Sequence, residues 1–145
     1  MQNVTILGST GTIGEQTLDV IARHPTKYNV FALTANTNVN VMLQQCLQYK
    51  PNYAVMLDEQ AAKQLAEALK NEGANTVVLT GISNLEDVSS DVEVDIVMAA
   101  IVGAAGLRPA MAAAKTGKRI LLANKETLVM AGKLFMDAVK KGGAS

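Results

Sequence analysis

The sequence has a single cysteine, Cys46, and a single histidine, so it can form no internal disulfide and is a poor candidate for a zinc site. Tryptophan is missing and aromatic residues make up only 3% of the chain, which leaves few rings for stacking on nucleic-acid bases. The 13 basic and 13 acidic side chains cancel. We therefore expect neither a nucleic acid nor a membrane as a partner, because both attract basic proteins.

No uncharged apolar run is long enough to cross a bilayer. The longest run, residues 96–107, is short and interrupted by glycines, as in a buried strand followed by a turn. The N-terminus lacks a basic segment, and residues 3–7 already have the composition of a strand. We expect no secretory leader and a cytoplasmic protein. Cys46 falls in an apolar helical pattern, which favours a packing role.

Short apolar runs alternate with helical patterns along the 145 residues, which are enough for one compact domain. The expected strands are residues 4–7, 30–34, 53–57, 76–79, 96–100 and 119–123. The expected helices are residues 13–23, 39–48, 59–70, 104–116 and 126–140, and residues 82–91 form a short helix or a loop. This alternation predicts an α/β fold, a Rossmann-type doubly wound parallel sheet of about six to seven strands in three αβα layers. The working assumption for the strand order is 3-2-1-4-5-6.

A glycine-rich segment, Gly8-Ser9-Thr10-Gly11-Thr12-Ile13-Gly14, joins the first expected strand to the first expected helix. Glycine at such a place permits a tight turn with positive φ and lets the backbone approach a pyrophosphate. The helix N-terminus then directs free N–H groups and a partial positive charge at the phosphates. The hydroxyls of Ser9, Thr10 and Thr12 are further donors. The spacing is G-x-x-G-x-x-G rather than G-x-G-x-x-G, and a tight turn without a ligand is the alternative.

The second expected strand is followed by Asn36, Thr37 and Asn38 rather than by a carboxylate. Domains that prefer NAD often have an acidic residue there, which binds the ribose diol and would repel a 2′-phosphate. Amides and hydroxyls can donate to that phosphate, so we expect a preference for NADP, without a lysine or arginine to strengthen it. The alternative is that these residues only cap the next helix, and Asn38 is able to do both.

The carboxyl end of the fifth expected strand leads through Ala100 and Ile101 into a segment rich in small residues, including two glycines. Open α/β sheets bind ligands at this edge, so we expect a nicotinamide ring to lie against the backbone here. Close packing of a helix on the strand explains the same residues equally well.

Three polar residues, Asn124, Lys125 and Glu126, follow the sixth expected strand in otherwise apolar surroundings. Asn124 can cap the next helix and Glu126 suits its first turn, which is the simpler interpretation. A lysine is unfavourable at a helix N-terminus, however, and an anionic ligand would offset that cost. We therefore expect Lys125 to bind a ligand.

Residues 8–14, 98–107 (MAAIVGAAGL) and 121–128 (LLANKETL) resemble the 1-deoxy-D-xylulose 5-phosphate reductoisomerase family in order and spacing. The resemblance implies rearrangement and NADPH-dependent reduction of deoxyxylulose phosphate to 2-C-methyl-D-erythritol 4-phosphate. It also implies a divalent cation, Mg²⁺ or Mn²⁺, and a place in the methylerythritol phosphate pathway of isoprene biosynthesis. The cofactor-binding residues expected with it are Gly8, Thr10, Gly11, Thr12, Ile13, Gly14, Asn36, Thr37, Asn38, Ala100, Ile101, Asn124 and Glu126. Lys125 is expected to bind the sugar-phosphate substrate.

Two departures from the family pattern affect these expectations. The family often has Gly-Lys-Asn where this chain has Asn36-Thr37-Asn38, and its metal-binding Asp and Glu, lid and C-terminal domain should follow residue 145. The acidic residues within the chain are scattered, and only Glu126 falls near the expected site. We expect residues 1–145 to form an NADPH-binding domain without catalytic residues or metal ligands. The chain alone is then inactive, and the full-length enzyme is a homodimer.

Two other functions remain open at this level. One is a stand-alone NADP-binding or sensing module, since the sequence leaves open whether the chain is complete or one domain of a longer protein. The other is the cofactor domain of a different reductase with a G-x-x-G-x-x-G turn, such as a semialdehyde dehydrogenase. That chemistry needs a nucleophilic cysteine, and Cys46 falls in the middle of an expected helix.

Overall fold

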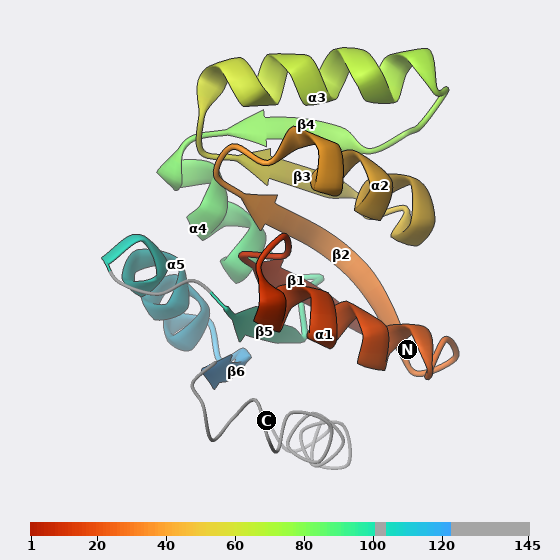
Figure 1. Ribbon diagram of the computed structural model, residues 1–145. Helices are drawn as coiled ribbons and strands as arrows, with labels where there is room; N and C mark the ends of the chain where they lie inside the picture. Colours follow the sequence, from red (N-terminus) through yellow and green to blue (C-terminus); the bar gives the residue numbers. More distant parts are fainter. Residues whose placement is uncertain (101–103, 123–145) are drawn as a thin grey trace.

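The computed structural model describes residues 1–100 and 104–122 (Figure 1). Strands and helices alternate in the order β1 (Gln2–Leu7), α1 (Thr12–Ala22), β2 (Tyr28–Ala35), α2 (Val39–Tyr49), β3 (Tyr53–Met56), α3 (Glu59–Asn71), β4 (Val77–Thr80), α4 (Ile82–Ser90), β5 (Ile96–Ala99), α5 (Ala104–Lys115) and β6 (Arg119–Leu122). Every strand expected from the sequence is found. The segment expected at 82–91 to be a short helix or a loop forms the helix α4, and the helix expected at 126–140 lies outside the described residues.

All six described strands are parallel, in the order β4-β3-β2-β1-β5-β6. The assumed order 3-2-1-4-5-6 is therefore wrong, because β4 pairs with β3 and β5 takes the place beside β1. Burial explains the difference. Val77 of β4 is 50% exposed, which an edge strand tolerates, whereas every residue of β5 is buried and requires neighbours on both sides.

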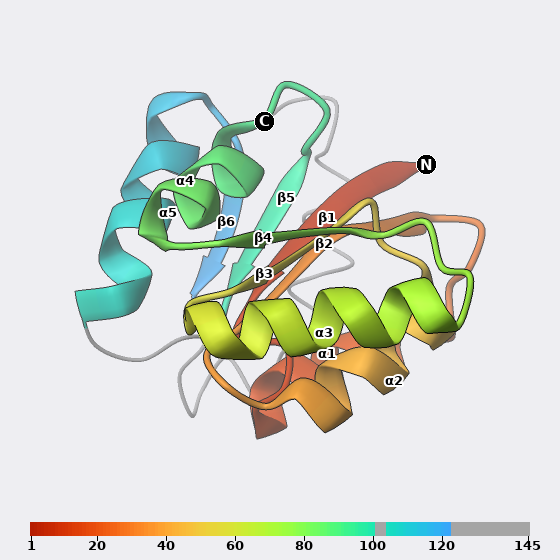
Figure 2. The same ribbon diagram turned by 90° about the horizontal axis from the view of Figure 1, so that it is seen from above.

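Helices cover both faces of the sheet, which confirms the three-layer αβα architecture. Figure 2 shows α1, α2 and α3 on one side and α4 and α5 on the other. One apolar cluster includes Leu18, Met42 and Leu65 from the first three helices. A second cluster includes Leu85 and Ala113 from the other two. Among the described helices, none combines the length and the apolar character that a bilayer crossing requires.

Candidate cofactor site

The carboxyl ends of three neighbouring strands bring the expected site segments to one edge of the sheet. Leu7 at the end of β1 is level with Thr34 of β2 and with Ala99 of β5. The glycine-rich turn, the segment 36–38 and Ala100 therefore follow adjacent strands. The strand order reverses between β1 and β5, and open α/β sheets bind ligands in the crevice at such a reversal.

The glycine-rich turn is fixed to the neighbouring strand β2 by backbone hydrogen bonds. Gly8 has a φ of 83°, a left-handed conformation that favours glycine. Its N–H donates to the Thr34 hydroxyl at 3.0 Å, and the Ser9 N–H donates to the Thr34 carbonyl at 2.8 Å. The first glycine is thus required by the shape of the turn itself.

The other two glycines of the turn serve different purposes. A Cβ on Gly14 would lie 2.6 Å from Ser9 Cα and closer still to the Gly8 carbonyl oxygen, so Gly14 lets α1 pack directly against the turn. A Cβ on Gly11 would meet only the Gly8 carbonyl oxygen, at 3.7 Å, which is an ordinary contact. Gly11 is exposed and has a φ of −81°, so neither strain nor packing within the described chain requires glycine there.

The N-terminus of α1 has the properties of an anion-binding site. Gly11 is its N-cap, and no side chain in the described ranges caps the helix. The first N–H groups of a helix have no partner within the helix and bear a partial positive charge. Thr12 is exposed and Ile13 half-buried, so a phosphate can approach their backbone.

The hydroxyls of the turn do not all face outward. Thr10 is half-buried and Thr12 exposed, so both hydroxyls are accessible and the expectation that they donate to a phosphate stays a prediction. Ser9 is fully buried, and its hydroxyl lies 3.9 Å from the sulfur of Met42 in α2. The prediction that Ser9 donates to a phosphate is therefore wrong, because α2 packs over its side chain.

The segment after β2 lies on the surface. Asn36, Thr37 and Asn38 are all exposed, and the Asn38 side chain accepts a hydrogen bond from the Val41 N–H at 3.2 Å. Asn38 thus caps α2, as the simpler interpretation predicted, while its amide nitrogen stays available to a ligand.

A carboxylate lies close to this segment, which the sequence did not reveal. The Asp58 N–H, at the end of β3, donates to the Asn36 carbonyl at 3.1 Å. The Asp58 carboxylate accepts from the Ala61 N–H at 2.8 Å and so caps α3. Asp58 follows β3, two strands away from β1 and the glycine-rich turn, but it is a direct neighbour of Asn36. Its negative charge weakens the electrostatic attraction of this segment for a 2′-phosphate.

Ala100 is half-buried at the end of β5, where its N–H donates to the Leu7 carbonyl at 2.9 Å. It therefore borders the glycine-rich turn directly. The remaining expected site residues, Ile101, Asn124, Lys125 and Glu126, lie outside the described residues.

The cysteine has no catalytic environment. Cys46 is 1% exposed in α2, and burial raises the pKa of its thiol to about 12. It is therefore protonated at neutral pH and inaccessible, so Cys46 is not suited to be the nucleophile of a semialdehyde dehydrogenase.

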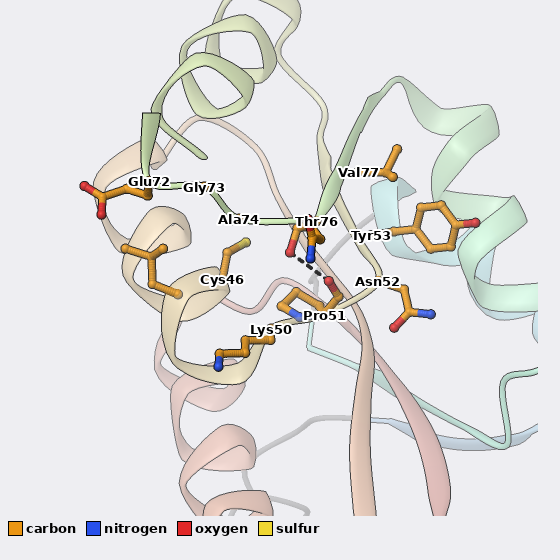
Figure 3. Close-up of a pocket in the computed structure, with 12 residues that line it drawn as sticks. Cys46, Lys50, Pro51, Asn52, Tyr53, Glu72, Gly73, Ala74, Thr76 and Val77 are labelled. Atoms are coloured by element: carbon orange, nitrogen blue, oxygen red, sulfur yellow. Dashed lines mark hydrogen bonds between the residues drawn. The ribbon is translucent and has the colours of Figure 1, made fainter. Parts of the chain in front are cut away.

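A cavity of about 690 Å³ lies at the opposite edge of the sheet, where the segments that lead into β3 and β4 meet (Figure 3). Its lining includes Cys46, Lys50, Tyr53 and Glu72. Across it, the Thr76 hydroxyl donates to the Pro51 carbonyl at 2.7 Å. This cavity is remote from the glycine-rich turn, because the amino and carboxyl ends of parallel strands lie at opposite edges of a sheet.

Acidic side chains do not gather at the candidate site. Within residues 1–100 and 104–122, no three His, Cys, Asp or Glu side chains lie close enough together to bind a metal ion. Asp95 lies at the amino edge of the sheet, where its carboxylate accepts a hydrogen bond from the Asn3 N–H at 2.8 Å. The described residues therefore do not fit a magnesium site.

Comparison with known proteins gives one consistent result. The family model described as 1-deoxy-D-xylulose 5-phosphate reductoisomerase matches residues 4–132. The reductoisomerases of Methylobacillus flagellatus and Nitrosomonas europaea are 66% and 62% identical to the chain over 100% and 99% of its length. The chain covers 36% and 35% of these two proteins, so it spans about a third of the curated relatives that it matches.

Solved structures agree with this result. A crystal structure of DOX-P reductoisomerase in complex with NADPH, fosmidomycin and magnesium matches with a TM-score of 0.82 and 44% identity, over 99% of this chain and 35% of that one. The Zymomonas mobilis reductoisomerase in complex with NADPH matches with a TM-score of 0.78 and 42% identity, over 98% of this chain and 37% of that one.

Proposed function

Because the chain belongs to the 1-deoxy-D-xylulose 5-phosphate reductoisomerase family, we propose that residues 1–145 form the NADPH-binding domain of such an enzyme. One observation supports this most directly. Gly11 is a glycine that neither strain nor packing requires, at the uncapped N-terminus of α1. Binding of a pyrophosphate explains why this residue is glycine, because a side chain would lie where the phosphates approach the backbone.

The proposed contacts follow the edge of the sheet. The pyrophosphate binds at Thr10, Gly11, Thr12 and Ile13, between Gly8 and Gly14, which shape the turn. The adenosine 2′-phosphate lies near Asn36, Thr37 and Asn38, and the nicotinamide near Ala100, Ile101, Asn124 and Glu126. NADPH supplies the hydride for reduction. The chain's own contribution is to bind its phosphates and orient its two ends along one edge of the sheet.

Lys125 is the residue proposed to bind the substrate, by pairing with the sugar phosphate. Lys125→Ala in the full-length protein should then reduce turnover about ten- to a hundred-fold, the loss of one charge-assisted hydrogen bond in a closed site. NADPH affinity should stay close to that of the wild type, and calorimetric titration of NADPH provides this control. An equally large loss of NADPH affinity would assign Lys125 to the cofactor instead.

We further propose that catalysis requires the rest of the enzyme, a cytoplasmic homodimer in its full-length form. The Mg²⁺ or Mn²⁺ ligands would be contributed by residues outside this chain, so the 145-residue chain should not oxidise NADPH with deoxyxylulose phosphate. Absorbance of the reduced nicotinamide, followed with substrate and either metal, tests this. Turnover by the isolated chain would refute it.

The cofactor proposal is tested by calorimetric titration with NADPH and NADH. We expect tighter binding of NADPH, with a modest ratio because no cation is present in segment 36–38 and Asp58 lies beside it. Gly11→Val should abolish NADPH binding while the far-UV circular dichroism stays unchanged. The added side chain would occupy the space proposed for the pyrophosphate and not space filled by the protein. Normal NADPH binding by folded Gly11→Val would refute the pyrophosphate site.

A further inference from the structure

In addition to the bonds from Thr34, the glycine-rich turn is held by a buried polar side chain, Gln45 of α2. Gln45 is 7% exposed and lies between Met42 and Cys46, which are apolar and buried in the same helix. Burying an amide costs free energy unless the amide is hydrogen-bonded. An apolar residue would fill this position without that cost. The buried amide must therefore have a hydrogen-bonding role.

The Gln45 amide makes its described hydrogen bond to the turn. Its nitrogen, Nε2, donates to the Ser9 carbonyl at 2.8 Å in a buried contact. The orientation of the amide follows from its partner, because a carbonyl accepts hydrogen bonds and only the NH₂ group can donate one. The amide oxygen has no partner within the described part of the chain. The Gln45 amide therefore gives the Ser9 carbonyl of the turn its hydrogen-bond donor, while its own oxygen stays without a described partner.

This contact also determines where the next N–H points. A trans peptide is planar, with its C=O and N–H directed to opposite sides. The Ser9 carbonyl points toward α2, so the Thr10 N–H points away from α2. No described residue accepts a hydrogen bond from the Thr10 N–H. The Ser9–Thr10 peptide thus presents a free donor beside the N-terminus of α1.

We propose that Gln45 is a positioning residue for the cofactor: by binding the Ser9 carbonyl, it holds the Thr10 N–H in place for a phosphate oxygen of NADPH. This inference rests on the proposed function. The turn has other supports, since Thr34 binds Gly8 and Ser9 and Gly14 packs beneath them. Of these contacts, the one from Gln45 determines the orientation of the Ser9–Thr10 peptide.

The experiment compares two substitutions of Gln45 in the full-length protein. Gln45→Met keeps the length of the side chain and removes the donor, and we expect the Kd for NADPH to rise about ten-fold, the value of one hydrogen bond to a charged group. Gln44→Met is the matched control, because Gln44 is exposed on the same helix, and it should bind NADPH as the wild type does. Circular dichroism checks that each variant is folded.

Gln45→Glu distinguishes positioning from packing. A protonated glutamic acid can donate to the Ser9 carbonyl, whereas an ionised carboxylate repels it, and burial raises the pKa of a carboxyl group toward neutrality. The ratio of Kd for Gln45→Glu to Kd for the wild type should be near one at pH 6 and rise about ten-fold by pH 8.5. Taking the ratio cancels the titration of NADPH itself. A packing role would give a ratio that does not change with pH.

Failure of the positioning role can be distinguished from failure of the proposed function. Unchanged NADPH affinity in Gln45→Met, or a flat pH ratio in folded Gln45→Glu, would overturn the positioning role. If Gln45→Met fails to fold, the pH dependence of folded Gln45→Glu still decides, because this side chain keeps the shape of glutamine and loses its donor only when it ionises. Absence of NADPH binding by the wild type would instead overturn the proposed function.

Discussion

Replacing Gly14 by alanine should destabilise the domain, whereas the same change at Gly11 should not. The new Cβ at position 14 would lie 2.6 Å from Ser9 Cα and 2.7 Å from the Ser9 carbonyl carbon. Carbon atoms in contact are normally about 3.5–4.0 Å apart, so α1 would have to move away from the turn by about 1 Å. Ser9 cannot yield easily, because it is bound by Thr34 on one side and Gln45 on the other.

The expected magnitude follows from two opposing effects. Overpacking of a buried site costs about 1–3 kcal/mol, and contact with backbone atoms places Gly14→Ala near the upper value. Alanine gains up to about 1 kcal/mol over glycine within a helix. The free energy of unfolding should therefore fall by about 2 kcal/mol, or about 4–8 °C in melting temperature for a domain of this size.

Gly11→Ala is the matched control for this prediction. Its Cβ has ordinary contact distances and its backbone is not left-handed, so the free energy of unfolding should change by about 0.5 kcal/mol or less. Thermal and urea unfolding, followed by circular dichroism, measure both variants. Equal stability of the two variants would refute the assignment of Gly14 to packing and Gly11 to ligand approach.

Two further predictions concern the helix caps and alkaline pH. Asn38→Ala removes the cap of α2 and should lower the free energy of unfolding by about 1 kcal/mol, measured by urea unfolding. Asn36→Ala should leave it unchanged, because Asn36 is exposed and its side chain has no described hydrogen bond. Burial raises the pKa of Cys46 from 9.0 to about 12 and that of Tyr28 from 10.0 to about 12. Because these groups ionise at lower pH in the unfolded chain, their contribution to stability is complete below pH 9 and is lost as the pH rises toward 12. Unfolding measured between pH 8 and 11 should show this decline, less steep in Cys46→Ala, and an equal slope in that variant would contradict the assignment.

The elements of the fold could be predicted from the sequence, but their order in the sheet could not. Apolar strands and amphipathic helices are local patterns, so β1, α1 and β5 appear close to their observed bounds. The position of β4 at the edge depends on how completely each strand is buried, which no local pattern determines. For this reason the assumed strand order places β4, with its exposed Val77, in the middle of the sheet, whereas the structure has it at the edge.

The candidate site shows the same division. The turn and the segment 36–38 could be located from the sequence, because both follow strands directly. The burial of Ser9 could not, since it depends on Met42 and Gln45, residues far along the chain. One signal was present: Gln45 interrupts the apolar face of α2 at a position where a polar residue needs a buried partner.

The pairing of β1 with β5 has a consequence for folding. Asn3 and Asp95, which are 92 residues apart, are hydrogen-bonded at this seam, whereas the other strand pairs of the described sheet join segments much closer in the chain. Closing so long a loop costs conformational entropy before any contact compensates for it. The complete edge, with the end of β5 beside the glycine-rich turn, therefore exists only after this seam has closed. A ligand that contacts both sides of the seam should protect it from opening, by an amount that grows with the logarithm of the ligand concentration over its Kd.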